Sequence, residues 1–192
     1  MMEFFRACLK ERQCLLQPIE AAQLMLALEA VSKISGDMAE VGSFEGVSAK
    51  LLAATDRRRT LHIFDTFEGL PEPGKEDSAG FYSGQYRASE AEVKKYLQDF
   101  NVRIYKGLFP STAGPITDKT FAFVHLDVDL YDSTKACLEF FYPRMALGGI
   151  ILTHDYAARE EGVYRAFKDF FVDKPEPVIE LGGNQGMIVK LR

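Results

Sequence analysis

Short apolar runs alternate with helix-spaced apolar residues along most of this chain. Five runs have the length and composition of buried strands, and the segments between them carry apolar residues at helical spacing. Strands that alternate with helices form parallel sheets with right-handed crossovers. The pattern therefore predicts an α/β fold with a doubly wound, Rossmann-like, mostly parallel sheet, built from residues 38–40, 60–64, 101–105, 121–126 and 148–153.

The first 36 residues depart from this alternation and are predicted to be helical. Residues 2–16 show a loose helical spacing that suits a helix packed over the domain or against another subunit. A second helix is predicted to begin at Pro18, with a buried stripe formed by Ile19, Ala22, Leu26 and Ala30. We therefore divide the chain into an N-terminal helical segment, 1–36, and a ligand-binding domain, 37–192.

Three further segments have local signals. Residues 65–87 form a predicted loop, and loops of this length inside a domain are usually functional or mobile. The helix that follows the fourth strand is predicted to be capped by Asp132 or Ser133. Near the C-terminus, two short apolar segments flank the glycine-rich turn 182–186, which predicts an antiparallel hairpin.

A glycine turn at residues 42–46 follows the first predicted strand and opens a helix. It places free N–H groups at the carboxyl end of a strand, where open α/β sheets bind their ligands. A dinucleotide fingerprint needs a middle glycine, but Phe44 stands there, and the charge of Glu45 disfavours a phosphate. An NAD-linked reductase is therefore the least favoured function, and a ligand with an ammonium, a carboxylate and a positive sulfur suits the turn better.

Composition and charge narrow the range of partners. The 192 residues carry a formal net charge of -5 and a sequence pI near 5.3, so no nucleic-acid partner is expected. The three cysteines lack any C-x-x-C spacing and are predicted to be reduced, packed thiols. No apolar run reaches the length of a signal peptide or membrane span. We expect no membrane partner and a cytoplasmic location, and we leave a homo-oligomer open.

Acidic residues follow the fourth and fifth predicted strands. Asp127 and Asp129 come directly after the apolar run FAFVHL, and Asp155 follows the fifth strand. In an extended segment Asp127 and Asp129 would point to the same side, with side chains about 7 Å apart. Buried acids are costly unless they are solvated or paired. The pattern predicts either a simple strand-end turn or a site with hard oxygen ligands for a cation such as magnesium.

The ordered set of motifs resembles the macrocin O-methyltransferase (TylF-like) family. The resemblance runs from about residue 40 to the C-terminus, on the segments EVGSFEGVS, DTFEGLP, KGLFPST, HLDVDLYDST and GG…HDY. It implies a class I S-adenosylmethionine-dependent O-methyltransferase that usually needs magnesium and methylates a sugar hydroxyl in natural-product pathways. The expected partner is then a small hydroxylated acceptor, and residues 37–192 form the cofactor-binding domain.

The resemblance also assigns roles to residues. Asp127 and Asp155 match metal ligands, and Asp129 matches the proposed general base. Glu40, Gly42 and Gly46 would line the methionine end of the cofactor, and Asp65 would bind its ribose. The full set assigned to the cofactor is Glu40, Gly42, Ser43, Gly46, Ser48, Asp65, Thr66, Phe67, Gly107, Leu108, Phe109 and Asp127.

One departure from the family leaves alternatives open. Relatives carry two acids where this chain has His154 and Asp155, so the third metal ligand would be an imidazole or be absent. Histidine favours transition metals more than magnesium, and His154 is also a candidate second base. The identity of the metal and the need for one stay open. A cofactor-binding, non-catalytic partner protein is the alternative function, and Phe81, Tyr82 and Tyr86 form the predicted acceptor wall.

Overall fold

A seven-stranded sheet forms the centre of the computed structural model, which describes residues 2–156 and 162–192. The strand order is β3-β2-β1-β4-β5-β7-β6; the first five strands are parallel, and β7 runs antiparallel to both β5 and β6. The predicted sheet and the C-terminal hairpin are both confirmed. The strands are β1 (Asp37–Val41), β2 (Leu61–Asp65), β3 (Val102–Lys106), β4 (Phe121–Leu126), β5 (Met145–Thr153), β6 (Ile179–Glu180) and β7 (Gly186–Val189).

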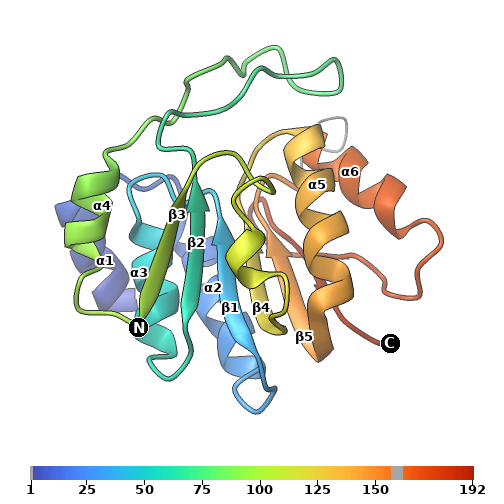
Figure 1. Cartoon of the computed structure of the whole chain (residues 1–192), viewed down its shortest axis with the longest axis horizontal. Helices are drawn as coiled ribbons and strands as arrows, with labels where there is room; N and C mark the ends of the chain where they lie inside the picture. Colours follow the sequence, from blue (N-terminus) through green and yellow to red (C-terminus); the bar gives the residue numbers. More distant parts are fainter. Residues whose placement is uncertain (1, 157–161) are drawn as a thin grey trace.

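Helices cover both faces of this sheet and give three layers. One core joins the first three helices to one face, and a second core joins the last two to the other. In Figure 1, α5 lies in front of the sheet and α2 lies behind it. The helices are α1 (Met2–Glu11), α2 (Pro18–Ala30), α3 (Val47–Thr55), α4 (Glu90–Tyr96), α5 (Tyr131–Phe141) and α6 (Gly162–Phe171), with short 3-10 turns η1 (Gly114–Ile116) and η2 (Tyr142–Arg144).

The central strand β4 determines where the site lies. All six of its residues are buried, as expected for a strand covered on both faces. Val41 at the end of β1 pairs with Leu126 of β4, and Leu126 pairs with Thr153 at the end of β5. The strand order reverses between β1 and β4, and ligands of open α/β sheets bind at such a point. The segments that follow these three strands therefore meet at one edge.

The buried face of α2 differs from the predicted stripe. Ile19 and Leu26 are 50% and 56% exposed, whereas Leu24 and Leu28 are 0% and 1% exposed. The predicted stripe was wrong because this helix has apolar residues on nearly every side. Their spacing therefore did not indicate which side is buried. The buried side of α2 is the one that packs against α3 and β5.

The long loop after β2 crosses the carboxyl edge of the sheet, at the top of Figure 1. Its base is closed by two backbone hydrogen bonds, from Leu70 N to Gln85 O at 2.8 Å and from Gly84 N to Leu70 O at 2.9 Å. The loop is therefore a structured strap over the edge where the strands end.

The strap also caps α5. Asp77 Oδ1 accepts a hydrogen bond from Tyr131 N at 2.7 Å, and this carboxylate stands at the start of the helix. The predicted caps Asp132 and Ser133 are wrong, because the helix begins earlier and Leu130 occupies the N-cap position. A distant residue supplies the negative charge that a helix start favours.

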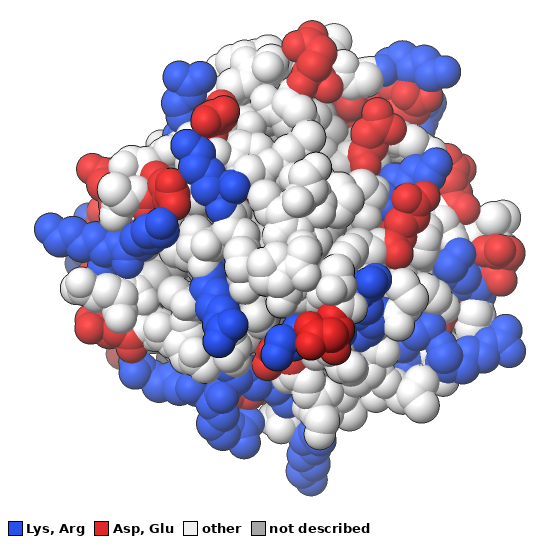
Figure 2. Space-filling view, in the orientation of Figure 1, with Lys and Arg blue, Asp and Glu red and all other residues white. Residues whose placement is uncertain are grey.

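The surface carries charges of both signs (Figure 2), and the cysteines form no disulfide among the described residues. Figure 2 shows charged side chains of both signs around a largely uncharged centre on the face that α5 covers. Among the described residues, no helix is long and apolar enough to cross a membrane. Cys8, Cys14 and Cys137 are free thiols, and Cys8 and Cys137 are buried. The predicted packing is confirmed for Cys8 and Cys137, whereas Cys14 is half-buried.

The two faces of α2 give a direct stability test. We expect Leu28→Ala to lower the free energy of unfolding by about 2–5 kcal/mol, because it leaves a cavity in the core. Leu26→Ala on the exposed face should change it by no more than about 0.5 kcal/mol. Urea unfolding of both variants measures the difference, and equal losses would contradict the assigned orientation of α2.

Candidate functional site

A cavity of about 380 Å³ opens at the carboxyl ends of the central strands. Its volume lies within the range of about 300–1,000 Å³ that is typical of small-molecule sites. Its walls come from the β1–α3 turn, the end of β2 with the base of the strap, the loop after β3, the residues after β4 and β5, and the α1–α2 linker. Segments between Gln13 and Asp155 therefore build one pocket.

Gly42 packs the β1–α3 turn against the end of β4. Its φ is 83°, and a Cβ atom on it would lie 1.8 Å from the carbonyl oxygen of Asp127. Only glycine permits this conformation together with so close an approach. The N–H of Asp127 also donates to Val41 O at 2.9 Å. The backbone thereby holds the turn and Asp127 side by side.

Asp65 connects the same turn to the end of β2. Its Oδ2 accepts hydrogen bonds from Ser43 N at 2.7 Å and Phe44 N at 2.9 Å, and its Oδ1 accepts one from Phe67 N at 2.7 Å. Burial raises the pKa of Asp65, although these N–H donors act in the opposite direction. Its carboxylate orders two loops while it lines the cavity.

Left-handed backbone conformations gather around the cavity. The described non-glycine residues with positive φ are Phe44, Phe67, Tyr86, Asp129 and Asp155, and all but Phe67 line the cavity. Each such conformation costs about 1–2 kcal/mol, and such residues cluster at functional sites. The expected extended geometry from Asp127 to Asp129 is wrong, because φ at Asp129 is 61° and the chain turns there.

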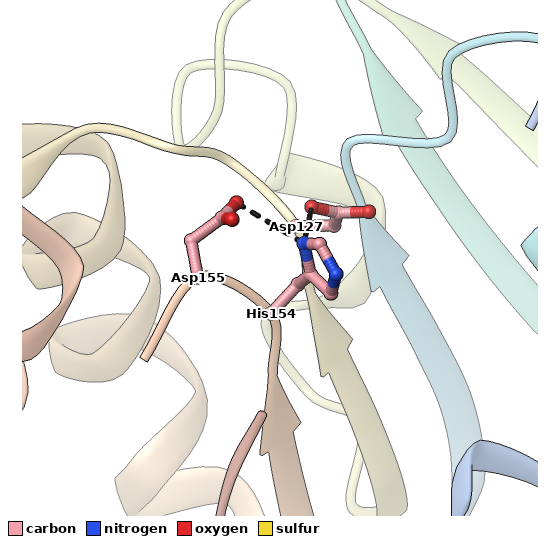
Figure 3. A group of neighbouring side chains, drawn as sticks. All are labelled: Asp127, His154 and Asp155. Atoms are coloured by element: carbon pink, nitrogen blue, oxygen red, sulfur yellow. Dashed lines mark ion pairs between the residues drawn. The ribbon is translucent and has the colours of Figure 1, made fainter. Parts of the chain in front are cut away.

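Asp127, His154 and Asp155 form a compact group at the ends of β4 and β5 (Figure 3). One potential ligand atom from each residue lies within 4.8 Å of the others. His154 Nδ1 is 3.4 Å from Asp127 Oδ1 and 3.1 Å from Asp155 Oδ2. On the other side of the ring, His154 Nε2 is 3.2 Å from Glu20 Oε2. The imidazole is therefore surrounded by three carboxylates.

This packing shifts the pKa values of the group. Burial opposes a charge on His154, but Asp127 and Asp155 outweigh burial and raise its pKa to about 12. Burial also opposes ionisation of Asp127, but His154 outweighs it and lowers the pKa of that carboxyl. Burial, Asp127 and Asp155 together raise the pKa of Asp129 well above its usual range. The group requires a positive charge between its carboxylates, which an imidazolium or a bound cation supplies.

Comparison with known proteins identifies the family. The sequence profile described as Macrocin-O-methyltransferase (TylF) matches residues 19–180, which include every segment that lines the cavity except the α1–α2 linker. The chain belongs to the macrocin O-methyltransferase family. The resemblance inferred from the motifs is confirmed.

Proteins similar to this chain include a named enzyme and two solved structures. The 8-demethyl-8-(2,3-dimethoxy-alpha-L-rhamnosyl)-tetracenomycin-C 4'-O-methyltransferase of Streptomyces olivaceus is 33% identical over 141 residues, 65% of this chain and 54% of that protein. The O-methyltransferase NovP superposes with a TM-score of 0.80 at 23% identity, over 93% of this chain and 82% of that one. A Bacillus cereus O-methyltransferase in complex with SAH gives a TM-score of 0.71 at 12% identity, over 99% and 91%. The chain spans about half the length of the curated relatives it matches.

Most residues assigned to the cofactor by the macrocin O-methyltransferase pattern lie in the cavity wall. The candidate base Asp129 and the candidate ligands His154 and Asp155 lie there too. The wall contains Gly42, Ser43, Ser48, Asp65, Thr66, Gly107, Leu108, Phe109 and Asp127 from the cofactor set.

Glu40 lies behind the wall and not in it. Its side chain is 0% exposed, and Oε1 lies 2.9 Å from Nδ1 of the equally buried His125. Burial raises the pKa of Glu40, against the effect of His125. The two residues are register partners on β1 and β4. The pair joins these strands beneath the cavity, and the contact between Glu40 and a cofactor stays a prediction.

Two other predicted cofactor residues and two predicted acceptor residues also lie outside the wall. Gly46 is the left-handed N-cap of α3, and Phe67 packs into the core under the strap. Of the aromatic residues predicted to form the acceptor wall, Tyr86 lines the cavity, whereas Phe81 and Tyr82 do not. Tyr82 is 64% exposed. The strap bends at Tyr86, where φ is 63°, and turns only this aromatic side chain inward.

Sequence reasoning missed the α1–α2 linker, whose residues 13–16 line the cavity. Arg12 fixes this linker to the glycine turn, because its Nε donates to Glu45 Oε2 at 2.8 Å. The charge of Glu45 is therefore paired with Arg12, so the argument that Glu45 repels a phosphate is wrong. Nothing in the local sequence indicates a contact between residues 33 positions apart.

Gly42 provides the test of this geometry. We expect Gly42→Ala to lower the free energy of unfolding by about 2–5 kcal/mol, from left-handed strain and overpacking against Asp127. Gly114→Ala is the matched control: no heavy atom lies within 4 Å of its added Cβ, so it should change stability by no more than about 0.5 kcal/mol. Thermal and urea unfolding measure both variants. A Gly42→Ala protein as stable as the control would contradict the close approach.

Proposed function

We propose that this protein is an S-adenosylmethionine-dependent O-methyltransferase acting on a hydroxyl group of a small molecule. The observation that carries the proposal is the single cavity that joins the glycine turn and Asp65 to the acidic group after β4 and β5. The named Streptomyces relative methylates a rhamnosyl 4'-hydroxyl by its description. That relationship supports a sugar of a natural product as the acceptor class.

The donor half of the proposed site is the β1–α3 turn with the ends of β2 and β3. S-adenosylmethionine, when bound, supplies a methyl group on a positively charged sulfur. Ser43 and Ser48 offer polar contacts at the turn, and Asp65 stands where the ribose hydroxyls are expected. Phe109 and Leu108 provide an apolar wall for the base. The Bacillus cereus protein in complex with SAH, which has the same fold, supports the class of cofactor.

The acceptor half is the acidic group. In the proposed reaction the acceptor oxygen forms a bond to the methyl carbon, the carbon–sulfur bond breaks, and the hydroxyl proton passes to a base. We assign that role to Asp129, which lines the cavity next to the donor half. Tyr86 and the base of the strap line the cavity beside this group. Methyl transfer requires this alignment of donor and acceptor.

A divalent cation is part of the proposal because the donor set suits one. Ligands in neighbouring positions around an ion at about 2.1 Å are about 3 Å apart, close to the 3.1 Å and 3.4 Å that separate His154 Nδ1 from the two carboxylates. Asp127, His154 and Asp155 would hold the ion. It would supply Lewis acidity at the acceptor oxygen. The imidazole favours manganese, iron or zinc over magnesium.

Cofactor binding tests the donor half. We expect Asp65→Ala to weaken the binding of S-adenosylhomocysteine at least about tenfold, or about 1.4 kcal/mol. The substitution removes the expected ribose contact and the hydrogen bonds that Asp65 accepts from the glycine turn. Glu68→Ala, at a 75% exposed side chain in the same loop, should leave the affinity unchanged. Isothermal titration calorimetry gives both values. An absence of heat with the unmodified protein at millimolar ligand would refute the proposed cofactor.

Turnover tests the acceptor half. We expect Asp129→Asn to lower kcat by about 10²–10⁴-fold, the usual contribution of a general base, while affinity for S-adenosylhomocysteine changes little. Methyl transfer to a rhamnosylated aglycone, with and without Mn²⁺ or a chelator, measures the effect. A non-catalytic binding protein would instead bind the cofactor and give no product, and Asp129→Asn would then change nothing.

A further inference from the structure

Glu20 is a buried acid that neither the predicted site nor the proposed reaction uses. It lies in the first turn of α2 and is 1% exposed. Its Oε2 accepts a hydrogen bond from Gln17 N at 2.7 Å, which completes a capping box. Its only cationic partner within ion-pair distance, in residues 2–156 and 162–192, is His154 at 3.2 Å. Capping explains the bond to Gln17 but not why a carboxylate is buried against this imidazole.

The two nitrogens of His154 face different groups. Nδ1 faces Asp127 and Asp155, and Nε2 faces Glu20. A neutral imidazole carries one N–H, and the group that accepts this proton decides which nitrogen keeps a free lone pair. Histidine ligands of metals almost always donate their second N–H to a carboxylate or carbonyl in this way. Nε2 lies 3.2 Å from Glu20 Oε2 without a hydrogen bond of ordinary geometry to any described residue, and the nearby carboxylate favours the proton on this nitrogen. The lone pair of Nδ1 then faces Asp127 and Asp155.

A second arm runs from Glu20 to Asp155. Glu20 Oε1 accepts a hydrogen bond from Asn184 N at 2.9 Å, and Asn184 Nδ2 donates to Asp155 Oδ1 at 2.6 Å. This leaves Oδ2 of Asp155 on the side of His154. The turn fits tightly around the acid, since a Cβ on Gly183 would lie 2.8 Å from Glu20 Cγ. One carboxylate thus contacts both residues that follow β5, one directly and one through Asn184.

We propose that Glu20 is a positioning residue that fixes the ring orientation and tautomer of His154, and through Asn184 the orientation of Asp155, for binding a divalent cation. This inference rests on the proposed metal-assisted function. It makes α2, which lies outside the predicted cofactor-binding domain, part of the acceptor half of the site.

Glu20→Gln separates the proposed effect of the carboxylate on the metal site from its role in capping α2. Glutamine has nearly the same volume and can complete a capping box with its amide oxygen, so the start of α2 is retained. Its amide nitrogen cannot accept a hydrogen bond, so the acceptor for Asn184 N and the negative charge opposite Nε2 are lost. We expect Mn²⁺ affinity, measured with the metal alone from the free-Mn²⁺ EPR signal, to fall about 10–100-fold. Glu29→Gln, at an exposed position of the same helix, is the control and should bind Mn²⁺ like the unmodified protein. Thermal unfolding verifies that all variants are folded.

A double-mutant cycle excludes a merely structural role. If Glu20 acts through His154 as well as through Asn184, then Glu20→Gln should lower Mn²⁺ affinity less in a His154→Gln background, where only the route through Asn184 to Asp155 remains, than in the unmodified protein. Equal losses in both backgrounds, or no loss in the single variant, would overturn the inference and leave the proposed function standing. An unmodified protein that binds S-adenosylhomocysteine but not Mn²⁺ would overturn the inference and the metal, but not the methyltransferase. One that binds neither ligand would overturn all three.

Discussion

The contact between Gly42 and the backbone of Asp127 is the constraint on which the rest of the site depends. It occurs where the strand order reverses, between β1 and β4, and it leaves no room for a side chain. Because the two backbones touch, the glycine turn that we propose for the cofactor and the acids that we propose for the acceptor share one cavity. A wider separation would give two unconnected sites, and methyl transfer needs donor and acceptor in line.

The second constraint is charge. Asp127, Asp155 and Glu20 surround His154, and Asp129 lies in the same cavity wall. Burying acids together is unfavourable unless a positive charge lies among them. In the protein alone His154 carries that charge, and its pKa is raised to about 12 for this reason. A bound cation would take over the same role.

Segments from outside the central sheet also build the site. The α1–α2 linker forms one wall of the cavity and is joined to the glycine turn by Arg12 and Glu45. The C-terminal hairpin brings Asn184 against Asp155, and the strap is held to α5 through Asp77. The predicted helical segment and the predicted cofactor-binding domain follow one another along the chain, but both contribute residues to the site.

The sequence alone determined the sheet, the positions of the strand ends, the family and about half of the cavity residues. These follow from local signals: continuous apolar strands such as FAFVHL, glycines at fixed spacing, and acids placed directly after strands. Tertiary structure decided the face that α2 buries, the cap of α5, the pairing of Glu45 and the place of Glu40 behind the wall. Each of these depends on partners far apart in sequence, such as Asp77 with Tyr131 or Glu20 with His154, and no local pattern records such contacts. Spacing can place a residue at a strand end, but only packing determines what its side chain faces.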